Sequence, residues 1–428
     1  MRHGSAPADS PRRPLPWLLI ALLVTYLGSV VLLSYREGLT MIAKVTGLAL
    51  VGGAALHAVL DNRPLQFPVP FRLWGAWFVF ALLTLWQATR PELAIQKALT
   101  VVQVLFVALV IFHCLVWHGA LRFYWLVLVA LGLLSCVIVW TDPAAFSDED
   151  GRVFGPLGNA NAFGAMLVAG FIMVLAAAFE PVSRAAKLLS VAAATVFFAM
   201  VLQTGSRQGL LGMFVALLVF GSALAYRARQ GLLRNLLALG IVATLISVGV
   251  LVAKTSEYWF RVEAAIAVSR GDTGDADSSL LERIWLYQRA AELALEQPVA
   301  GVGLDNFRVQ SRHIGAGPVG TYTHSNYMEV LVSTGLPGFL LYFSVGIYML
   351  RELWRARHLA FGNDEFGSYL RVTALVLTYM VMDVATVSYY DKFVWLVMPW
   401  IVAELQAMRR MQVVRVPTTA PISGNVSR

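Results

Sequence analysis

The chain has 428 residues, of which 58% are hydrophobic and 14% are charged, and its formal net charge is +8 at pH 7. Soluble domains are about 45–50% apolar and about 25% charged, so this composition excludes an ordinary soluble protein. Apolar runs of about 20 residues, long enough to cross a bilayer, recur along most of the sequence. The sequence therefore predicts an all-α polytopic membrane protein.

Twelve transmembrane helices are predicted. Their ranges are 15–33, 39–60, 72–88, 93–116, 121–140, 161–179, 185–203, 208–226, 232–253, 324–349, 369–388 and 393–408. The first range follows Arg12 and Arg13, as the apolar part of a signal peptide would. It is too long for a signal peptide and has no clear small-residue cleavage site, so we expect it to remain as an anchor.

The orientation is predicted from lysine and arginine, which collect in short loops on the cytoplasmic side. If the N-terminus is cytoplasmic, every second connection should be basic. The basic residues on that side are Arg2, Arg12, Arg13, Arg63, Arg72, Arg122, Arg184, Lys187, Arg227, Arg229, Arg234, Arg351, Arg355, Arg357, Arg409, Arg410 and Arg415. Topology therefore explains most of the positive charge, and we expect no nucleic-acid partner.

Two connections on the opposite, outer side are long. Residues 254–323 include DADSSLLERIWLYQRAAELALEQP, whose helix formers and final Pro298 predict a helix, so this insert is partly helical. The connection 141–164 carries Asp148, Glu149 and Asp150, which could ligate a divalent cation. Cation sites need several converging oxygens, and consecutive acidic residues on a loop are more often only solvated. We expect no metal site.

Arg207, in LQTGSRQGLLG, lies between two predicted spans on the outer side, where the positive-inside rule disfavours arginine. A lone interfacial arginine most often extends its side chain to the lipid headgroups. Gly205 and Gly209 favour a second interpretation, because glycine lets another backbone or a ligand approach closely. We therefore treat Arg207 as a candidate anion-binding residue.

Arg283 lies in the first turns of the predicted outer helix, with Tyr287 one turn later on the same face. An exposed arginine on such a helix is usually a solvated surface residue. Two arginines that face the membrane surface would nevertheless suit a lipid-linked phosphate or pyrophosphate, because guanidinium binds phosphate oxygens in pairs. Arg289, on another face, is a weaker candidate.

His324 stands at the entrance of the tenth span, above an apolar run. A lone histidine at a helix entrance is most often a hydrogen-bonded structural residue, but here a polar collar surrounds it. The collar is Thr321, Tyr322, Thr323, Ser325, Asn326 and Tyr327. Such a collar can orient sugar hydroxyls, and a neutral imidazole among them could accept a proton from an attacking hydroxyl.

The segments ERIWLYQRAAELALEQPVAGVGLDNF and THSNYMEVLVSTGLPGFL resemble the signature region of the O-antigen ligase and polymerase superfamily. The matching residues are Arg283, Trp285, Pro298, Gly301, Gly303, His324, Ser325, Gly335 and Gly338. The segments RVFGPLGNANAFGAML and TGSRQGLLG resemble two earlier segments of the same family. Ser325 stands where many members have asparagine.

The resemblance implies a metal-independent, inverting glycosyltransferase without a cofactor, in the bacterial inner membrane with its active site facing the periplasm. Its partners would be an undecaprenyl-pyrophosphate-linked glycan donor, the lipid A core as acceptor, and membrane lipids. By resemblance, Arg207 and Arg283 hold the pyrophosphate and His324 is the essential histidine. Further candidates for orienting a substrate are Asn159, Asn161, Tyr287, Ser325 and Asn326.

The predicted domains are transmembrane helices 1–9 over residues 1–253, a periplasmic loop domain over 254–323, helices 10–12 over 324–408, and a cytoplasmic tail over 409–428. The compact outer insert favours an O-antigen ligase. An O-antigen polymerase or a protein O-oligosaccharyltransferase of the same superfamily remains an alternative.

A polytopic transporter is the alternative from another class. It would place ionisable residues near the middle of the spans and is often built from internal repeats. No repeat is visible, and the candidate residues gather on one side. Asp383 is the main exception, and we expect it to pair with Lys392 or with an arginine.

Overall fold

The computed structural model of the protein describes residues 16–33, 38–148, 151–227, 278–311, 320–361 and 365–414, and these ranges are mainly helical. The longer helices are α1 (Trp17–Leu33), α2 (Thr40–Leu60), α3 (Val69–Leu83), α4 (Pro91–His118), α5 (Leu121–Thr141), α6 (Ala160–Ala177), α7 (Arg184–Gln203), α8 (Arg207–Arg227), α11 (Ser278–Glu296), α13 (Asn326–Arg355), α14 (Phe366–Met382) and α15 (Val394–Val414). The short elements are η1 (Thr84–Gln87), η2 (Ala144–Phe146), η3 (Gly155–Leu157), α12 (Phe307–Gln310) and η4 (Ala356–Phe361).

The predicted spans coincide with these helices. Among the described residues, eight helices are long and apolar enough to cross a membrane: α2, α3 together with η1, α4, α5, α6, α7, α8 and α13. Two shorter apolar helices, α1 and α14, match the first and eleventh predicted ranges, and α15 matches the last. The ninth range, 232–253, lies outside the described residues. The chain is therefore an all-α, multi-pass membrane protein, as predicted.

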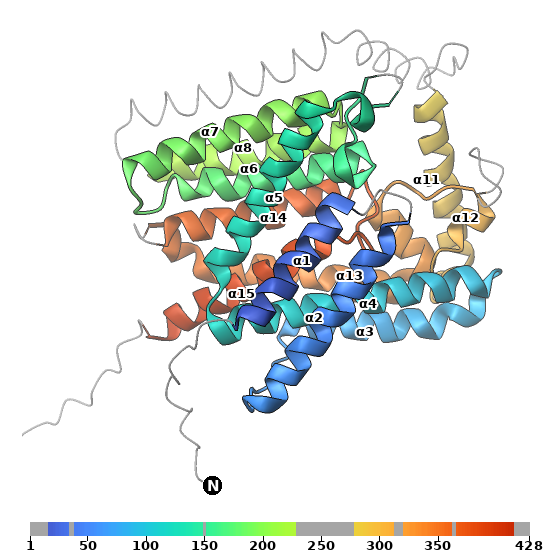
Figure 1. Ribbon diagram of the computed structural model, residues 1–428. Helices are drawn as coiled ribbons and strands as arrows, with labels where there is room; N and C mark the ends of the chain where they lie inside the picture. The colour runs from blue at the N-terminus through green and yellow to red at the C-terminus, as the bar shows by residue number, and fades with distance from the viewer. Residues whose placement is uncertain are drawn as a thin grey trace, which may run out of the picture.

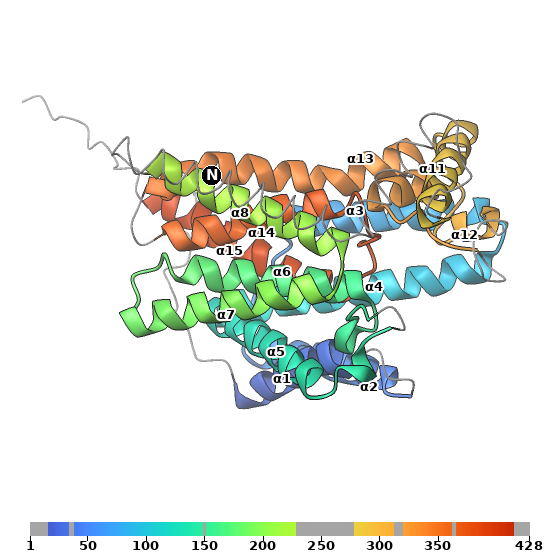
Figure 2. The same cartoon turned by 90° about the horizontal axis from the view of Figure 1, so that it is seen from above.

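Most of the helices run side by side, and α11 lies across one end of the bundle (Figure 1). Helix α6 packs against α7 and α8, and α14 packs against α8. On the other side, α13 packs against α3, α15 against α4, and α1 against α2. Figure 2 shows α13 running along the bundle, with α11 and α12 at the same end.

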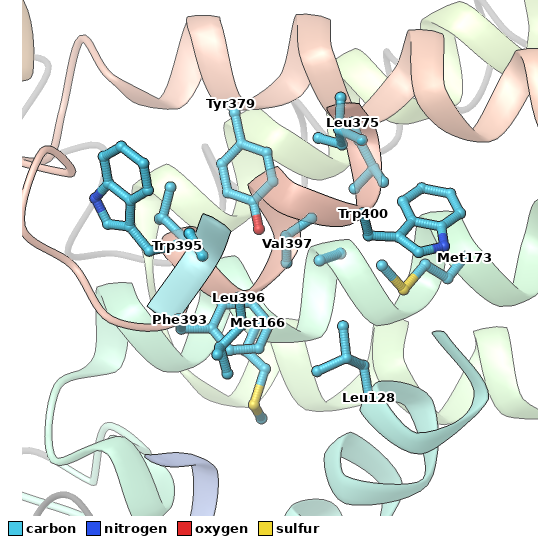
Figure 3. Close-up of a cluster of buried hydrophobic side chains, with 14 of the residues drawn as sticks. Leu128, Met166, Met173, Leu375, Tyr379, Phe393, Trp395, Leu396, Val397 and Trp400 are labelled. Carbon is cyan, nitrogen blue, oxygen red and sulfur yellow. The ribbon is translucent and has the colours of Figure 1, made fainter. Parts of the chain in front are cut away.

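Buried side chains of α15 pack with side chains of α5, α6 and α14 in one hydrophobic cluster (Figure 3). Trp400 is fully buried, and its indole nitrogen donates to the carbonyl oxygen of Leu121 at 3.2 Å. Trp395 donates in the same way to Tyr389 at 2.9 Å. Because both polar indole groups have partners, two of the largest side chains enter the core without an unpaired donor.

Hydrogen bonds join connections that are predicted to lie on the same side of the membrane. At the outer end, the Arg90 amide donates to the Asn306 side chain at 2.8 Å, which joins the connection after α3 to the insert before α13. At the inner end, the Trp117 indole donates to the Pro64 carbonyl at 3.1 Å. The side of the membrane that each end faces stays a prediction.

Helix α13 is broken at Gly335, and the break attaches the outer insert to the bundle. Gly335 has φ 64° and ψ −176°, a backbone region that only glycine readily adopts. Pro337 has no N–H, so Ser333 loses its helical hydrogen-bond donor and its carbonyl accepts from Gly303 at 3.0 Å instead. The Leu336 amide in turn donates to the Pro298 carbonyl at 2.7 Å.

These hydrogen bonds explain why glycine and proline occupy several positions of the signature segments quoted above. A Cβ built on Gly301 would lie 2.5 Å from the carbonyl oxygen of Val332, and a Cβ on Gly335 would lie 2.5 Å from the carbonyl group of Val299. Both clashes involve backbone atoms, which cannot move aside as a flexible side chain can. The turn after α11 therefore packs backbone to backbone on α13.

We predict that Gly335→Ala destabilises the folded protein, while Gly346→Ala in the same helix does not. The backbone conformation of Gly335 alone would cost about 1–3 kcal/mol with any other residue, and the clash with Val299 adds to this cost. At Gly346 the nearest atom to a built Cβ is the flexible end of Met380, 3.3 Å away. Differential scanning fluorimetry of the two purified variants checks the difference, and equal melting temperatures would contradict it.

Candidate functional site

A cavity of about 120 Å³ lies at the outer end of the bundle, where α11 crosses it. It is lined by Arg152, Asn161, Gly205, Arg207, Gln208, Arg283 and Ala385. Its three arginines come from the loop before α6, from the start of α8 and from α11. The structure therefore brings together the two arginines named from the sequence and adds a third.

Arg207 is the first residue of α8, and the turn before it is tied to α6. The Ser206 hydroxyl accepts from the Gly209 amide at 3.0 Å and donates to the Asn161 side chain at 2.8 Å. Helix N-termini attract anions, because their first N–H groups lack helical partners and the helix dipole is positive there. The position of Arg207 therefore combines a guanidinium group with the positive end of a helix.

The two glycines beside Arg207 allow the close approaches predicted for them. A Cβ built on Gly209 would lie 3.4 Å from the Cα of Gly164 in α6, so the two helices meet backbone to backbone. A Cβ built on Gly205, which has φ 57°, would lie 3.5 Å from the side chain of Arg152. The glycines thus bring α6 and a second arginine next to Arg207.

Arg152 and Gln208 were missed in the sequence analysis. The Arg152 amide donates to the Asp148 carboxylate at 2.8 Å, which fixes the loop, while the guanidinium group reaches the cavity. Gln208 is 3% exposed, and its amide oxygen has no hydrogen-bond partner among the described residues. Arg152 also lies on the predicted outer side, where the positive-inside rule disfavours arginine, so the sequence could have indicated this residue. Nothing in the sequence indicated Gln208.

Arg283 is held in place by the apolar face of α11. Leu286, Ala290 and Leu293 pack against Val302, Phe307 and Val332, the residues that join the outer turn to α13. One turn after Arg283, the Tyr287 hydroxyl donates to the Val384 carbonyl at 3.3 Å. Arg289, on another face, pairs with Glu292 and Glu296. The helix therefore presents one arginine to the cavity and neutralises the other with its own carboxylates.

His324 lies in the segment just before α13 and is half-buried. Its ring nitrogen Nε2 lies 3.5 Å from the Thr321 hydroxyl oxygen. Burial lowers the pKa of His324 below its ordinary value, and the Arg283 guanidinium lowers this pKa further, while the Glu282 carboxylate opposes the change. The imidazole is therefore neutral near pH 7 and able to accept a proton. His324 does not line the cavity itself; Arg283, which does, is one of the charged groups that affect this pKa.

The polar collar around His324 is largely used inside the protein. Asn326 is fully buried. Its side-chain nitrogen donates to the Asp383 carboxylate at 3.0 Å, and its side-chain oxygen accepts from the Ser388 backbone amide at 3.1 Å. Ser325 is 4% exposed, and its hydroxyl lies 3.5 Å from the Asp383 carbonyl oxygen. These two side chains fix the start of α13, and their predicted contact with a substrate stays a prediction.

Asp383 does not have the partner expected from the sequence. Its carboxylate accepts from the Ser388 hydroxyl at 2.6 Å and from Asn326, rather than pairing with Lys392. The reason is local, because the chain after α14 turns back and brings Ser388 over the end of the helix. Asp383 therefore links α14 to the segment that carries His324.

Asn159 and Asn161 both stand at the start of α6 but differ in position. Asn159 is exposed and caps α6, because its side chain accepts from the amides of Asn161 and Ala162. Asn161 lines the cavity. A substrate in the cavity would therefore meet Asn161 before Asn159.

The described residues contain no group of three or more histidine, cysteine or carboxylate side chains that could hold a metal ion. Asp148 lies next to the cavity loop and binds the Arg152 amide, whereas Glu149 and Asp150 lie outside the described residues. Metal independence stays a prediction.

Comparison with protein families gives an independent result. Residues 192–343 match the family described as O-antigen ligase. This range contains Arg207, Arg283 and His324, and Arg152 lies before it. No curated protein matches the chain.

We predict that each arginine of the cavity contributes to binding pyrophosphate. Arg152→Ala, Arg207→Ala and Arg283→Ala should each weaken binding about 10–100-fold, because a hydrogen bond to a charged group contributes about 1.5–3 kcal/mol. Lysine should restore binding only partly, since it lacks the paired donors of guanidinium. Equilibrium binding of a polyprenyl pyrophosphate to purified protein measures this effect. Arg289→Ala, in the same helix as Arg283, is the control and should bind normally.

We also predict opposite shifts of the His324 pKa in two neighbouring variants. Glu282→Gln removes a negative charge and should lower this pKa further, whereas Arg283→Gln should raise it. Because burial is the largest cause of the depression, the pKa in Arg283→Gln should still lie below the ordinary value of about 6.5. The pH dependence of diethyl pyrocarbonate modification, followed on the His324 peptide by mass spectrometry, reports both shifts. Shifts in the same direction would contradict the electrostatic assignment.

Proposed function

We propose that this chain, which carries a domain of the O-antigen ligase family, is an O-antigen ligase. In this proposal it transfers a polysaccharide from undecaprenyl pyrophosphate to the lipid A core of lipopolysaccharide. Members of the family are glycosyltransferase-like enzymes of the ligase and polymerase type, which act on lipid-linked glycans. The observation that carries the proposal is the cavity with three arginines, one of which, Arg283, lowers the pKa of a neutral histidine.

The arginines would bind the pyrophosphate of the donor. Arg152, Arg207 and Arg283 supply planar guanidinium groups from three directions, and a pyrophosphate presents several anionic oxygens for them. As the bond between the sugar and the pyrophosphate breaks, negative charge grows on the departing oxygen. Cations already held in position stabilise this charge without rearranging.

His324 would act as the general base. Its neutral imidazole accepts the proton of an acceptor hydroxyl while the hydroxyl oxygen bonds to the anomeric carbon. The bond from this carbon to the pyrophosphate oxygen breaks at the same time, and the lipid pyrophosphate leaves with the electron pair. Attack from the face opposite the leaving group inverts the anomeric configuration. The cavity lies at the outer end of the bundle, which suits a donor whose lipid remains in the membrane.

The same chemistry would serve an O-antigen polymerase or a protein O-oligosaccharyltransferase, which differ in the acceptor. We prefer the ligase because the signature segment of this chain resembles that of the ligases. A transporter is not favoured, because the family match is to enzymes and the candidate residues gather at one end. By the positive-inside rule we place this end in the periplasm and the protein in the inner membrane.

A deletion strain tests the choice of acceptor. We predict that loss of a ligase leaves lipopolysaccharide core without polymer, while polymer accumulates on the carrier lipid. Gel electrophoresis of lipopolysaccharide distinguishes this result from a core that bears a single repeat, which would indicate a polymerase. Full-length polymer on the core of the deletion strain would exclude both functions.

The role of His324 is tested by complementing the same strain. His324→Ala should abolish ligation, because removing a positioned base costs about 10²–10⁴-fold in rate, while protein level and donor binding stay near wild type. His324→Gln should be equally inactive, although it keeps similar bulk and a hydrogen-bonding group. Near wild-type ligation by His324→Gln, quantified on the same gels, would reduce the residue to an orienting partner.

We also predict that the purified enzyme works in EDTA. The three arginines would supply the positive charge that a divalent cation supplies in many phosphate-binding enzymes. Transfer from a lipid-linked donor should therefore proceed at the same rate with and without chelator. Loss of activity in EDTA and its recovery with Mg²⁺ or Mn²⁺ would contradict this and would implicate Asp148, Glu149 and Asp150.

A further inference from the structure

A buried glutamate lies directly behind the segment that carries His324. Glu329, in the first turn of α13, is fully buried. One of its carboxylate oxygens accepts from the Thr323 amide at 3.0 Å, and the other has no hydrogen-bond partner among the described residues. Burying a carboxylate costs free energy that an apolar side chain would not cost. Packing alone therefore does not explain a glutamate at this position.

A second set of contacts near this segment is centred on Lys97 of α4. The Lys97 ammonium group lies 3.4 Å from the Asp305 carboxylate and 3.4 Å from the centre of the Tyr390 ring. The Lys97 side chain is only 11% exposed. Arg308 adds a second cation, 3.8 Å from Asp305. Lys97 and Arg308 thus both pair with the buried Asp305 carboxylate.

The same cations hold the residue that precedes Thr323. The Tyr322 hydroxyl accepts from Arg308 at 2.7 Å and from Lys97 at 3.1 Å. Tyr322 is therefore anchored through its side chain, and Thr323 is anchored through its backbone to Glu329. Two consecutive residues before His324 are thus anchored, Tyr322 by the two cations and Thr323 by Glu329.

The chain after His324 is anchored as well. The backbone amide of Asn326 donates to the backbone carbonyl oxygen of Asp383 at 2.8 Å. Between these anchors, His324 has φ 57°, in the left-handed region that is unfavourable for residues other than glycine. Such a conformation persists only where the surrounding structure determines it. The anchors on both sides supply that constraint.

We propose that Glu329 is a positioning residue for His324. By accepting the hydrogen bond from the Thr323 amide, the Glu329 side chain holds His324 in its left-handed backbone conformation, which keeps the imidazole half-buried. The catalytic consequence rests on the proposed function, in which His324 is the base. The consequence for the environment of the histidine does not depend on that function.

The test uses variants of the full-length protein purified in detergent. Glu329→Met removes the acceptor for the Thr323 amide and keeps the length of the side chain, and Glu329→Ala removes the same oxygens without added bulk. Glu329→Gln keeps a carbonyl oxygen in that place. Glu352→Ala is the matched control, because Glu352 lies in the same helix, is 2% exposed and pairs with Arg355 and Arg409 at the inner end.

Two measurements are made on each variant. The first is the pH midpoint of diethyl pyrocarbonate modification of His324, which reports its surroundings without requiring activity. The charged groups that face His324 are Arg283 and Glu282, and both are present in every variant. The second is the rate of transfer from the lipid-linked donor, with kcat and the apparent donor affinity determined separately.

In Glu329→Met we expect the midpoint to rise toward that of an ordinary histidine, because the imidazole leaves its half-buried place. We expect kcat to fall about 10–100-fold, since a misplaced catalytic group costs about 10²-fold per ångström, with donor affinity within about threefold. Glu329→Gln should keep the midpoint and most of the activity. Glu352→Ala should lower thermal stability and leave the midpoint unchanged.

An unchanged midpoint in Glu329→Met overturns the positioning role, and so does an equal shift in Glu352→Ala. If Glu329→Met does not accumulate, Glu329→Ala answers the same question. If the wild type transfers no glycan but the midpoint shifts as expected, the proposed function fails and the positioning role stands. If the wild type is active and Glu329→Met keeps both its midpoint and its rate, the positioning role fails and the proposed function stands.

Discussion

The backbone contact between the turn after α11 and the broken helix α13 determines where the candidate site forms. Pro337 and Gly335 release the carbonyls of Val332 and Ser333 from the helix, and the amides of Val302 and Gly303 bond to them at 2.8 and 3.0 Å. Buried backbone groups need partners, so the turn can sit on α13 in only one register. Because Arg283 precedes this turn and His324 precedes α13, the contact fixes these two residues relative to each other.

The bundle provides a second constraint, which acts on the other arginines. Gly164 and Gly209 let α6 and α8 approach closely, and the Ser206 hydroxyl bonds to the Asn161 side chain at that crossing. The start of α8 is thereby fixed beside the loop that carries Arg152. Close helix packing and a capped helix start are ordinary features of stable bundles, yet together they gather cationic groups at one point. The cost of placing them near a membrane surface is reduced because they lie at the end of the helices, where water and headgroups are in reach.

The charges at the outer end are divided between two environments. Lys97, Asp305 and Arg308 form a buried network behind the His324 segment, in which the Asp305 carboxylate pairs with both cations. The arginines of the cavity line an open space. His324 follows the segment that Lys97 and Arg308 hold through Tyr322, and burial together with the Arg283 guanidinium lowers the pKa of His324.

The sequence by itself determined the membrane architecture. Apolar runs of about 20 residues admit little besides spanning helices, because backbone groups in lipid must be satisfied within the segment. The eleven predicted spans that fall on described residues all coincide with helices. Local reasoning singled out Arg207 by its position and His324 by its polar neighbours, whereas the role of Arg283 came mainly from the resemblance to a known family.

Only the tertiary structure decided which of these residues meet. Arg152 and Gln208 join the cavity through contacts between segments far apart in the chain. The sequence alone gives no reason to expect the two residues at one site. The partners of Asp383 were predicted wrongly for the same reason, since a turn after α14 brings Ser388 and Asn326 closer than Lys392. Hydrophobic periodicity is a property of each segment alone. Side-chain convergence depends on how helices cross and how loops close, and those are set by packing among all the segments at once.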